Sequence, residues 1–336
     1  MKKQLVFLAV CIFLASDIFA QDFSELVKTG TPQEIREALS NGANAEVTDF
    51  PFWTVGQFHS EAAHQYQIET EGLTPLMLAA AFNSDPKVIP VLLTAGARIE
   101  EKDYEGGTPL MWAAEYNSNP AVISALLDAG ATVDDRTTMD ATALMLAAKN
   151  NQNPEVISTL QRAGANIEAR DADGYTPLMW AAENNPNPAI IFALVKAGAK
   201  IDDVTTDGWT PLTFAIVNTR NPTVVTALLD AGAKVDTRSP AGWTPLMSAA
   251  MSASNPEIIS ILLKAGAIVN DNSTSGATPL ILAARFNENP QIIPVLLKAG
   301  ADMSLKDNFG KTALDYVEEN RGVKGTQRYE ELKRRR

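Results

Sequence analysis

Apolar residues recur along this chain in short blocks that keep a fixed spacing of 34 residues. Each block opens with Thr-Pro-Leu or Thr-Ala-Leu, and most are followed by a second apolar stretch with helical spacing. A period between about 20 and 50 residues indicates stacked units, none of which buries its apolar face alone. The pattern therefore predicts an all-α array of repeats. The opening threonines are Thr74, Thr108, Thr142, Thr176, Thr210, Thr244, Thr278 and Thr312.

One such unit begins at Gly174, which is expected to lie in a turn. Thr176 can cap the first helix, and Pro177 can take its first position, where a missing N–H costs nothing. Asn185 is expected to end this helix in the left-handed conformation. The position of Gly174 is Gly in all other units except one, which has Asp140, so a turn with positive φ is indicated.

The second half of the same unit predicts a second helix. Asn187 is the expected N-cap, Pro188 the first helical residue, and Gly198 the residue that ends the helix. Ile190 and Leu194 recur at helical spacing and mark the buried stripe. Each unit should therefore fold as turn, helix, turn and helix. The matching N-cap residues of the other units are Asp85, Asn119, Asn153, Asn221, Asn255 and Asn289.

These features resemble the ankyrin repeat, and the resemblance covers residues 22 to about 320. It implies an ankyrin solenoid whose turn tips and first helices form a concave groove for a protein or peptide partner. The period of 34 departs from the family's 33. A second departure is that the usual His after Thr-Pro-Leu is replaced, which should weaken bonding between turns and leave more to packing. The replacing residues are Met77, Met111, Met145, Met179, Thr213, Met247 and Ile281.

The spacing also recovers a hidden first repeat. Pro32 precedes Gly42 by the same interval that separates Pro86 from Gly96, so an insertion of 20 residues interrupts the array between them. We expect a signal peptide (1–20), an N-terminal cap repeat (21–49), an aromatic insertion (50–71), seven repeats (72–310), and a C-terminal cap repeat with a basic tail (311–336).

The N-terminal residues have the pattern of a secretory signal peptide. Two lysines precede an apolar run, and cleavage is expected between Ala20 and Gln21. The protein should then be exported, to the periplasm or beyond the cell. A lipoprotein site at Cys11 is disfavoured because Val10 is bulky. Cys11 is the one cysteine, so the mature chain cannot use thiol chemistry, zinc–cysteine sites or disulfides.

The charge of the chain narrows the class of partner. The formal net charge is −12, and an acidic body argues against nucleic acid. The basic residues 333–336 fit a solvated end better than an anionic surface. No later stretch is long and apolar enough to span a membrane. We expect a monomer without a cofactor.

Candidate partner-binding residues lie where the repeat pattern is free to vary. Directly before the Thr-Pro-Leu openings stand Tyr175, Trp209 and Trp243, in consecutive units, which we expect to form one ridge of interface anchors. The alternative is that these rings stack only to cover the turns. Trp112 and Trp180, inside the first helices, are expected to fill the core.

A second set of variable positions follows the Ala-Ala pair of each first helix. Phe82, Tyr116 and Phe286 should face the groove, with Glu115 and Glu183 beside them. A mixed aromatic and charged surface suits a protein or peptide partner.

The alternative function is a ligand-binding, metal-binding or hydrolytic site formed by the insertion 50–71. His59 and His64 lie there, but their spacing does not match a His-Glu-x-x-His zinc site. The insertion could equally fold its aromatic residues over the first repeat or act as a specificity loop. No catalytic motif appears, so we do not expect an enzyme. The acidic pairs at Asp134 and Asp202 are expected to be solvated turn residues.

Overall fold

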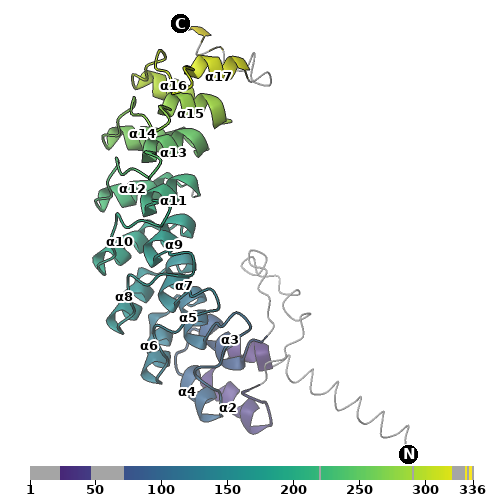
Figure 1. The fold of residues 1–336 in the computed structure, drawn as a ribbon. Coiled ribbons are helices and arrows are strands. Elements are labelled where there is room, and N and C mark those ends of the chain that lie inside the picture. The colour runs from purple at the N-terminus through teal and green to yellow at the C-terminus, as the bar shows by residue number, and fades with distance from the viewer. Residues whose placement is uncertain are drawn as a thin grey trace, which may run out of the picture. The chain divides into compact units, whose positions relative to one another are not determined.

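All regular elements of the described chain are helices, as the all-α prediction requires. The computed structural model describes residues 23–46, 72–218, 221–289 and 291–319, with residues 330, 333 and 334. The expected signal peptide 1–20, the insertion 50–71 with both histidines, and most of the tail after residue 319 lie outside the described residues. The chain divides into two compact units, Met1–Asp173 and Gly174–Arg336 (Figure 1).

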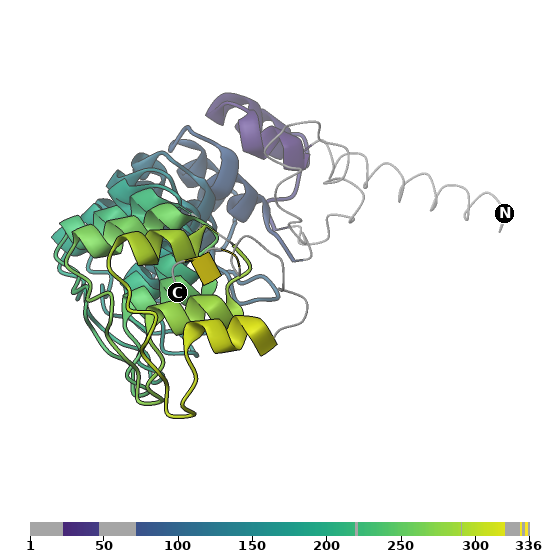
Figure 2. The ribbon, with the colours of Figure 1, turned by 90° about the horizontal axis from the view of Figure 1, so that it is seen from above.

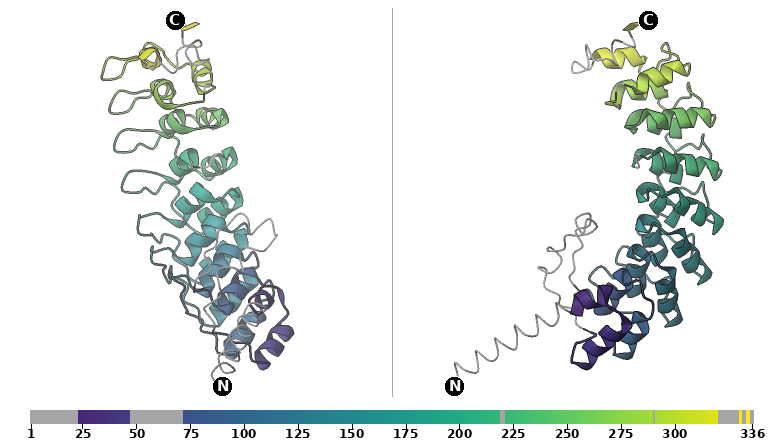
Figure 3. Two further views of the ribbon diagram at one scale, coloured as in Figure 1. Left: turned by 90° about the vertical axis from the view of Figure 1, so that its right-hand side faces the viewer. Right: turned by 180° about the vertical axis from the view of Figure 1, so that it is seen from behind.

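Unit 1, Met1–Asp173, is a stack of antiparallel helix pairs. First helices pack on first helices and second helices on second helices, which forms two layers (Figure 3). The first pair is a helix at residues 23–29 and α2 (Pro32–Ser40). It is followed by α3 (Pro75–Phe82) and α4 (Val88–Thr94), α5 (Pro109–Tyr116) and α6 (Pro120–Asp128), and α7 (Ala143–Asn150) and α8 (Pro154–Arg162).

Unit 2, Gly174–Arg336, has the same arrangement of helix pairs. Its longer loops lie together on one side of the stack (Figure 2). Its pairs are α9 (Pro177–Asn184) and α10 (Pro188–Lys196), α11 (Pro211–Val217) and α12 (Pro222–Asp230), α13 (Pro245–Ser252) and α14 (Pro256–Lys264), and α15 (Pro279–Phe286) and α16 (Ile292–Lys298). They are followed by α17 (Ala313–Glu319).

The threonine signal works as predicted. In α3, the Thr74 side chain accepts a hydrogen bond from the Met77 N–H, and the same bond opens every first helix from α5 to α15. Such a cap stabilises a helix by about 1 kcal/mol. The turn prediction is also confirmed, because Asp140 has φ 59° where the other units have a glycine with positive φ.

Six of the seven residues that replace the usual His belong to the core, and Thr213 is half-buried. Met77, Met111, Met145, Met179 and Met247 are at most 1% exposed. Bonds between neighbouring turns are made by the backbone. The Thr138 N–H donates to the Glu105 carbonyl at 2.8 Å, and equivalent bonds run from Ala172 to Met139, Thr274 to Ala241 and Asn308 to Ser275.

The end of the first helix corrects the sequence prediction. Asn185 has φ −89° and ψ 121°, so it is extended and not left-handed. At the matching position, Asn117 is buried, and its Nδ2 donates to the carbonyls of Ala80 and Asn83 in the preceding repeat, both at 2.8 Å. Its Oδ1 accepts from the Asn119 N–H at 2.9 Å. The asparagine therefore links two repeats, and its amide satisfies backbone carbonyls that water cannot reach.

The second helices α4 and α16 begin two residues later than the Asp-Pro and Asn-Pro signals predict. Both contain a proline, Pro90 or Pro294, four residues after the first proline. Pro90 has no N–H to donate to the Pro86 carbonyl and its ring crowds that group. The Ile89 N–H bonds to the Pro86 carbonyl at 3.3 Å instead, so the entry is a tighter turn.

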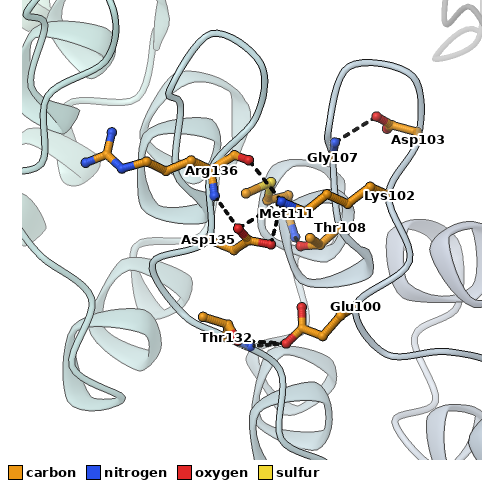
Figure 4. A network of polar contacts seen from close by, with 9 residues as sticks. All are labelled: Glu100, Lys102, Asp103, Gly107, Thr108, Met111, Thr132, Asp135 and Arg136. Atoms are coloured by element: carbon orange, nitrogen blue, oxygen red, sulfur yellow. Dashed lines mark hydrogen bonds and ion pairs between the residues drawn. The ribbon is translucent and has the colours of Figure 1, made fainter.

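Several acidic loop residues accept bonds from the next repeat and are not simply solvated, which corrects the expectation for Asp134 and Asp202. Figure 4 shows Glu100 pointing at Thr132, whose N–H donates to Glu100 Oε1 at 2.7 Å. The Asn166 N–H donates to Asp134 Oδ1 at 3.0 Å, and the Lys234 N–H donates to Asp202 Oδ1 at 2.9 Å. Part of the negative charge of the chain is therefore structural.

Replacing the buried amide should weaken unit 1 much more than replacing its exposed neighbour. Asn117→Ala leaves two buried carbonyls and one N–H without their partner, so we expect a loss of about 2–4 kcal/mol of unfolding free energy. Urea unfolding followed by circular dichroism measures it. Ser118→Ala, at an exposed position, is the control and should cost less than about 0.5 kcal/mol. Equal losses would contradict the linking role.

Candidate functional site

The surface of interest is the first-helix face, defined here as the side chains four, seven and eight residues after each N-cap threonine. Most apolar residues of the first helices are buried, but Phe82 of α3 is 42% exposed and Phe286 of α15 is 48% exposed. Packing between repeats leaves much of each ring exposed, so each ring can also contact a partner.

In unit 1 this face carries three aromatic residues, Phe82, Trp112 and Tyr116, which we call the unit 1 cluster. The Tyr116 ring lies 5.9 Å from the Phe82 ring and is stacked 5.4 Å from the Trp112 ring, measured between centroids. Trp112 and the matching Trp180 are half-buried, so the expectation that they fill the core is wrong. Trp112 lies one helical turn before Tyr116 and shares its face.

The Trp112 ring is held in place by a carboxylate in the preceding turn. Its Nε1 donates to Asp103 Oδ2 at 2.6 Å. The other oxygen of Asp103 accepts from the N–H groups of Glu105 at 2.9 Å and Gly107 at 2.7 Å. One side chain thus closes the turn and orients the indole.

Unit 2 repeats this device at its last described turn. Asp307 Oδ1 accepts from the N–H groups of Phe309 at 2.9 Å and Lys311 at 3.0 Å, and its Oδ2 accepts from the Tyr316 hydroxyl. Burial opposes the charge on Asp307, but these hydrogen bonds outweigh it and lower the pKa of Asp307.

The sequence contains a signal for this device that the motif analysis missed. Three units have Asp at the position five residues before the N-cap threonine. In each of these units the residue four positions after the threonine is Trp or Tyr, and no other unit has this combination. In four of the other units Thr or Ser stands at this position and the later residue is not an aromatic donor, while the unit opened by Thr74 has Glu69 and Leu78. The pairs are Asp103 and Trp112, Asp171 and Trp180, and Asp307 and Tyr316, against Thr137 and Leu146, Thr205 and Phe214, Ser239 and Ser248, and Ser273 and Leu282.

Glu115 is a half-buried carboxylate beside the unit 1 cluster. Asn150 Nδ2 donates to Glu115 Oε1 at 2.5 Å. Burial raises the pKa of Glu115. The hydrogen bonds from Asn150 and Tyr116 and the charge of Lys149 act in the opposite direction, and nearby Glu105 raises the pKa further. In unit 2, Asn218 Nδ2 donates in the same way to Glu183 Oε1 at 2.9 Å.

The structure brings only part of the expected aromatic ridge together. Tyr175 and Trp209 are half-buried, and both pack on Phe214, at 4.7 and 5.4 Å between ring centroids. Within the described chain, no ring contact joins Trp209 to the half-buried Trp243. Tyr175 and Trp209 therefore share a buried ring of α11 as their neighbour, and both partner contact and covering of the turns stay predictions for the three residues.

Phe286 and its neighbours form a cationic counterpart, which we call the unit 2 cluster. The Arg285 guanidinium carbon lies 4.7 Å from the centroid of the Phe286 ring and 5.0 Å from that of Tyr316. Lys311 Nζ lies 5.3 Å from the Tyr316 centroid. These distances are those of cation–π contacts.

Over the described ranges, no group of three or more His, Cys, Asp and Glu side chains is arranged to hold a metal ion. None of the helices in that part of the chain has the length and apolar character needed to cross a membrane.

Comparison with known proteins agrees with the helix pairs and turns described above. A family model described as ankyrin repeats (3 copies) matches residues 38–137, 144–239 and 220–307. Among solved structures, the crystal structure of the human ASB11 ankyrin repeat domain is similar, with a TM-score of 0.59 and 25% sequence identity. The match covers 68% of this chain and 99% of that one. A search of curated proteins found no significant match.

The pairing of Asp103 with Trp112 can be tested with the combination that other repeats use. Trp112→Phe removes the donor to Asp103 Oδ2 and should cost about 1–2 kcal/mol of unfolding free energy. Adding Asp103→Thr reproduces the pair Thr205 and Phe214, and should recover at least half of that loss. Urea unfolding of both single variants and the double variant measures the coupling. If the losses of the two single variants add up to the loss of the double variant, Asp103 and Trp112 are not energetically coupled and the prediction is wrong.

Proposed function

The chain belongs to the ankyrin repeat family, and from this premise we propose that it binds a protein or peptide partner on its first-helix face. Ankyrin repeats act as scaffolds for protein–protein interaction, and the helix pairs seen here are of that kind. The binding face proposed here follows from the side chains that the repeats do not need for their own packing.

The observation that carries this proposal is the exposure of aromatic rings at repeated positions. Phe82 and Phe286 are 42% and 48% exposed, each on a first helix and each beside other rings or charges. Large rings held in fixed positions lose little entropy on binding, and aromatic residues are enriched among the energetic anchors of interfaces. Glu115 and Glu183, fixed by Asn150 and Asn218, add charges that can select a partner.

We also propose that the protein acts without catalysis. The carboxylates described above close turns, join repeats or flank rings, and each of these roles is structural or suited to recognition. The alternative of a ligand, metal or hydrolytic site in the insertion 50–71 concerns residues outside the described ranges, and no observation favours it.

Export is the part of the proposal that concerns the N-terminus. The charged start and apolar run before Ala20 support it. We expect N-terminal sequencing of the protein purified from its native cell envelope or medium to begin at Gln21. A chain that keeps residues 1–20 and fractionates with the cytosol would contradict export. Light scattering after size exclusion, run on the same sample, should give the mass of a monomer.

Exposed phenylalanines allow a matched test of the binding face. A partner is first captured by crosslinking in the native envelope, and then purified. Phe82→Ala should weaken its binding by about 2 kcal/mol, roughly 30-fold, in a calorimetric titration. Phe192→Ala is the control, because Phe192 is 44% exposed but lies on the second helix α10. If both variants bind as the wild type does, the first-helix face is not the interface.

A further inference from the structure

The unit 1 and unit 2 clusters occupy matching positions of the repeat. Phe82 and Phe286 are separated by 286 − 82 = 204 residues, which is six repeats of 34. The same interval separates Asp103 from Asp307 and Trp112 from Tyr316. Each unit thus has an exposed phenylalanine on one first helix and, on the next first helix, a ring that the preceding turn holds by an aspartate.

The two clusters differ in whether the chain itself places cationic side chains over their rings. In unit 2 the chain itself supplies cations, since Arg285 lies over Phe286 and Tyr316, and Lys311 lies over Tyr316. In unit 1 the matching residues are Ala81 and Gly107, which carry no charge. Among the described residues, no Lys or Arg side chain lies over the Phe82 or Trp112 ring.

The charges around the unit 1 cluster favour a cation. Asp103 bonds to the edge of the Trp112 indole, and Glu115 lies beside Tyr116 on the same helix. Glu105 adds a third negative charge, against the one positive charge of Lys149 that acts on Glu115. Burial, more than any neighbouring charge, raises the pKa of Glu115, and it would equally strengthen the attraction between this carboxylate and a cation brought against it. The whole chain, at −12, also attracts basic partners.

We propose that an arginine side chain of the protein partner binds the unit 1 cluster, with its guanidinium against the rings of Phe82, Trp112 and Tyr116 and Glu115 as its counter-ion. The inference rests on the proposed function, since it names the chemistry that the first-helix face recognises. In unit 2 the guanidinium of Arg285 lies against both Phe286 and Tyr316, the rings that match Phe82 and Trp112. A planar guanidinium stacks on rings and bonds to a carboxylate, which a lysine ammonium does less well.

A random 12-residue peptide display library, selected on the immobilised full-length protein, tests the proposal. Peptides retained by the wild type but not by Phe82→Ala should be enriched in arginine over lysine and over acidic residues. Each selected peptide is then synthesised with arginine and with citrulline, which has the same shape but no charge. We expect the citrulline form to bind at least about tenfold more weakly to the wild type.

The Glu115→Gln variant identifies the counter-ion. It keeps an oxygen for the Asn150 bond, and circular dichroism checks that it folds. On this variant the difference between the arginine and citrulline peptides should shrink to less than about threefold, because the charge that discriminates them is gone. Arg285→Gln, in the matching position of unit 2, is the control and should leave the difference unchanged.

The remaining outcomes separate this inference from the proposed function. Peptides that need Phe82 but are acidic, are enriched in lysine, or bind equally as citrulline forms would overturn the arginine site and leave the binding face in place. If no selected peptide depends on Phe82, both the arginine site and the proposed binding face fail.

Discussion

Within each unit, the stacking of repeats depends on how one repeat satisfies the buried backbone groups of the one before it. The short first helices end in carbonyls that water does not reach, and the amide of a buried asparagine in the next repeat supplies their partners. The loops follow the same rule, because side-chain oxygens of one repeat accept N–H groups of the next. Packing can then rely on methionine and alanine, which fill space without polar demands.

This arrangement changes how the acidity of the chain is interpreted. Glu100, Asp134 and Asp202 join neighbouring loops, and Asp103 and Asp307 close turns. Each of these five carboxylates therefore has a structural role. Glu115 differs from them, because it is half-buried beside the rings of the unit 1 cluster and neither closes a turn nor joins two loops. Position in the fold therefore separates carboxylates that serve the stacking of repeats from one that is placed for recognition.

The first-helix face combines rigidity with variation. An aspartate fixes the Trp112 ring, and asparagines fix Glu115 and Glu183, so these groups are held in place before any partner arrives. Ordering them in advance lowers the entropic cost of binding. The residues that do this fixing change together with the groups they hold, because the position of Asp103 is Thr or Ser in four other units and the position of Asn150 is Phe or Tyr in others. A repeat array can in this way change its partner without changing its fold.

The sequence by itself determined the repeat, the helix pairs, the threonine caps and the turn at Asp140, because each depends on local backbone geometry within one unit. Only the tertiary structure decided what Asn117, Asp134 and Trp112 do, since their partners lie in another repeat or across a turn. The late start of α4 could be predicted from Pro90, because the ring of Pro90 crowds the Pro86 carbonyl one helical turn earlier. Periodicity identifies which residues match between repeats, and contacts between repeats decide which of those residues remain free to bind.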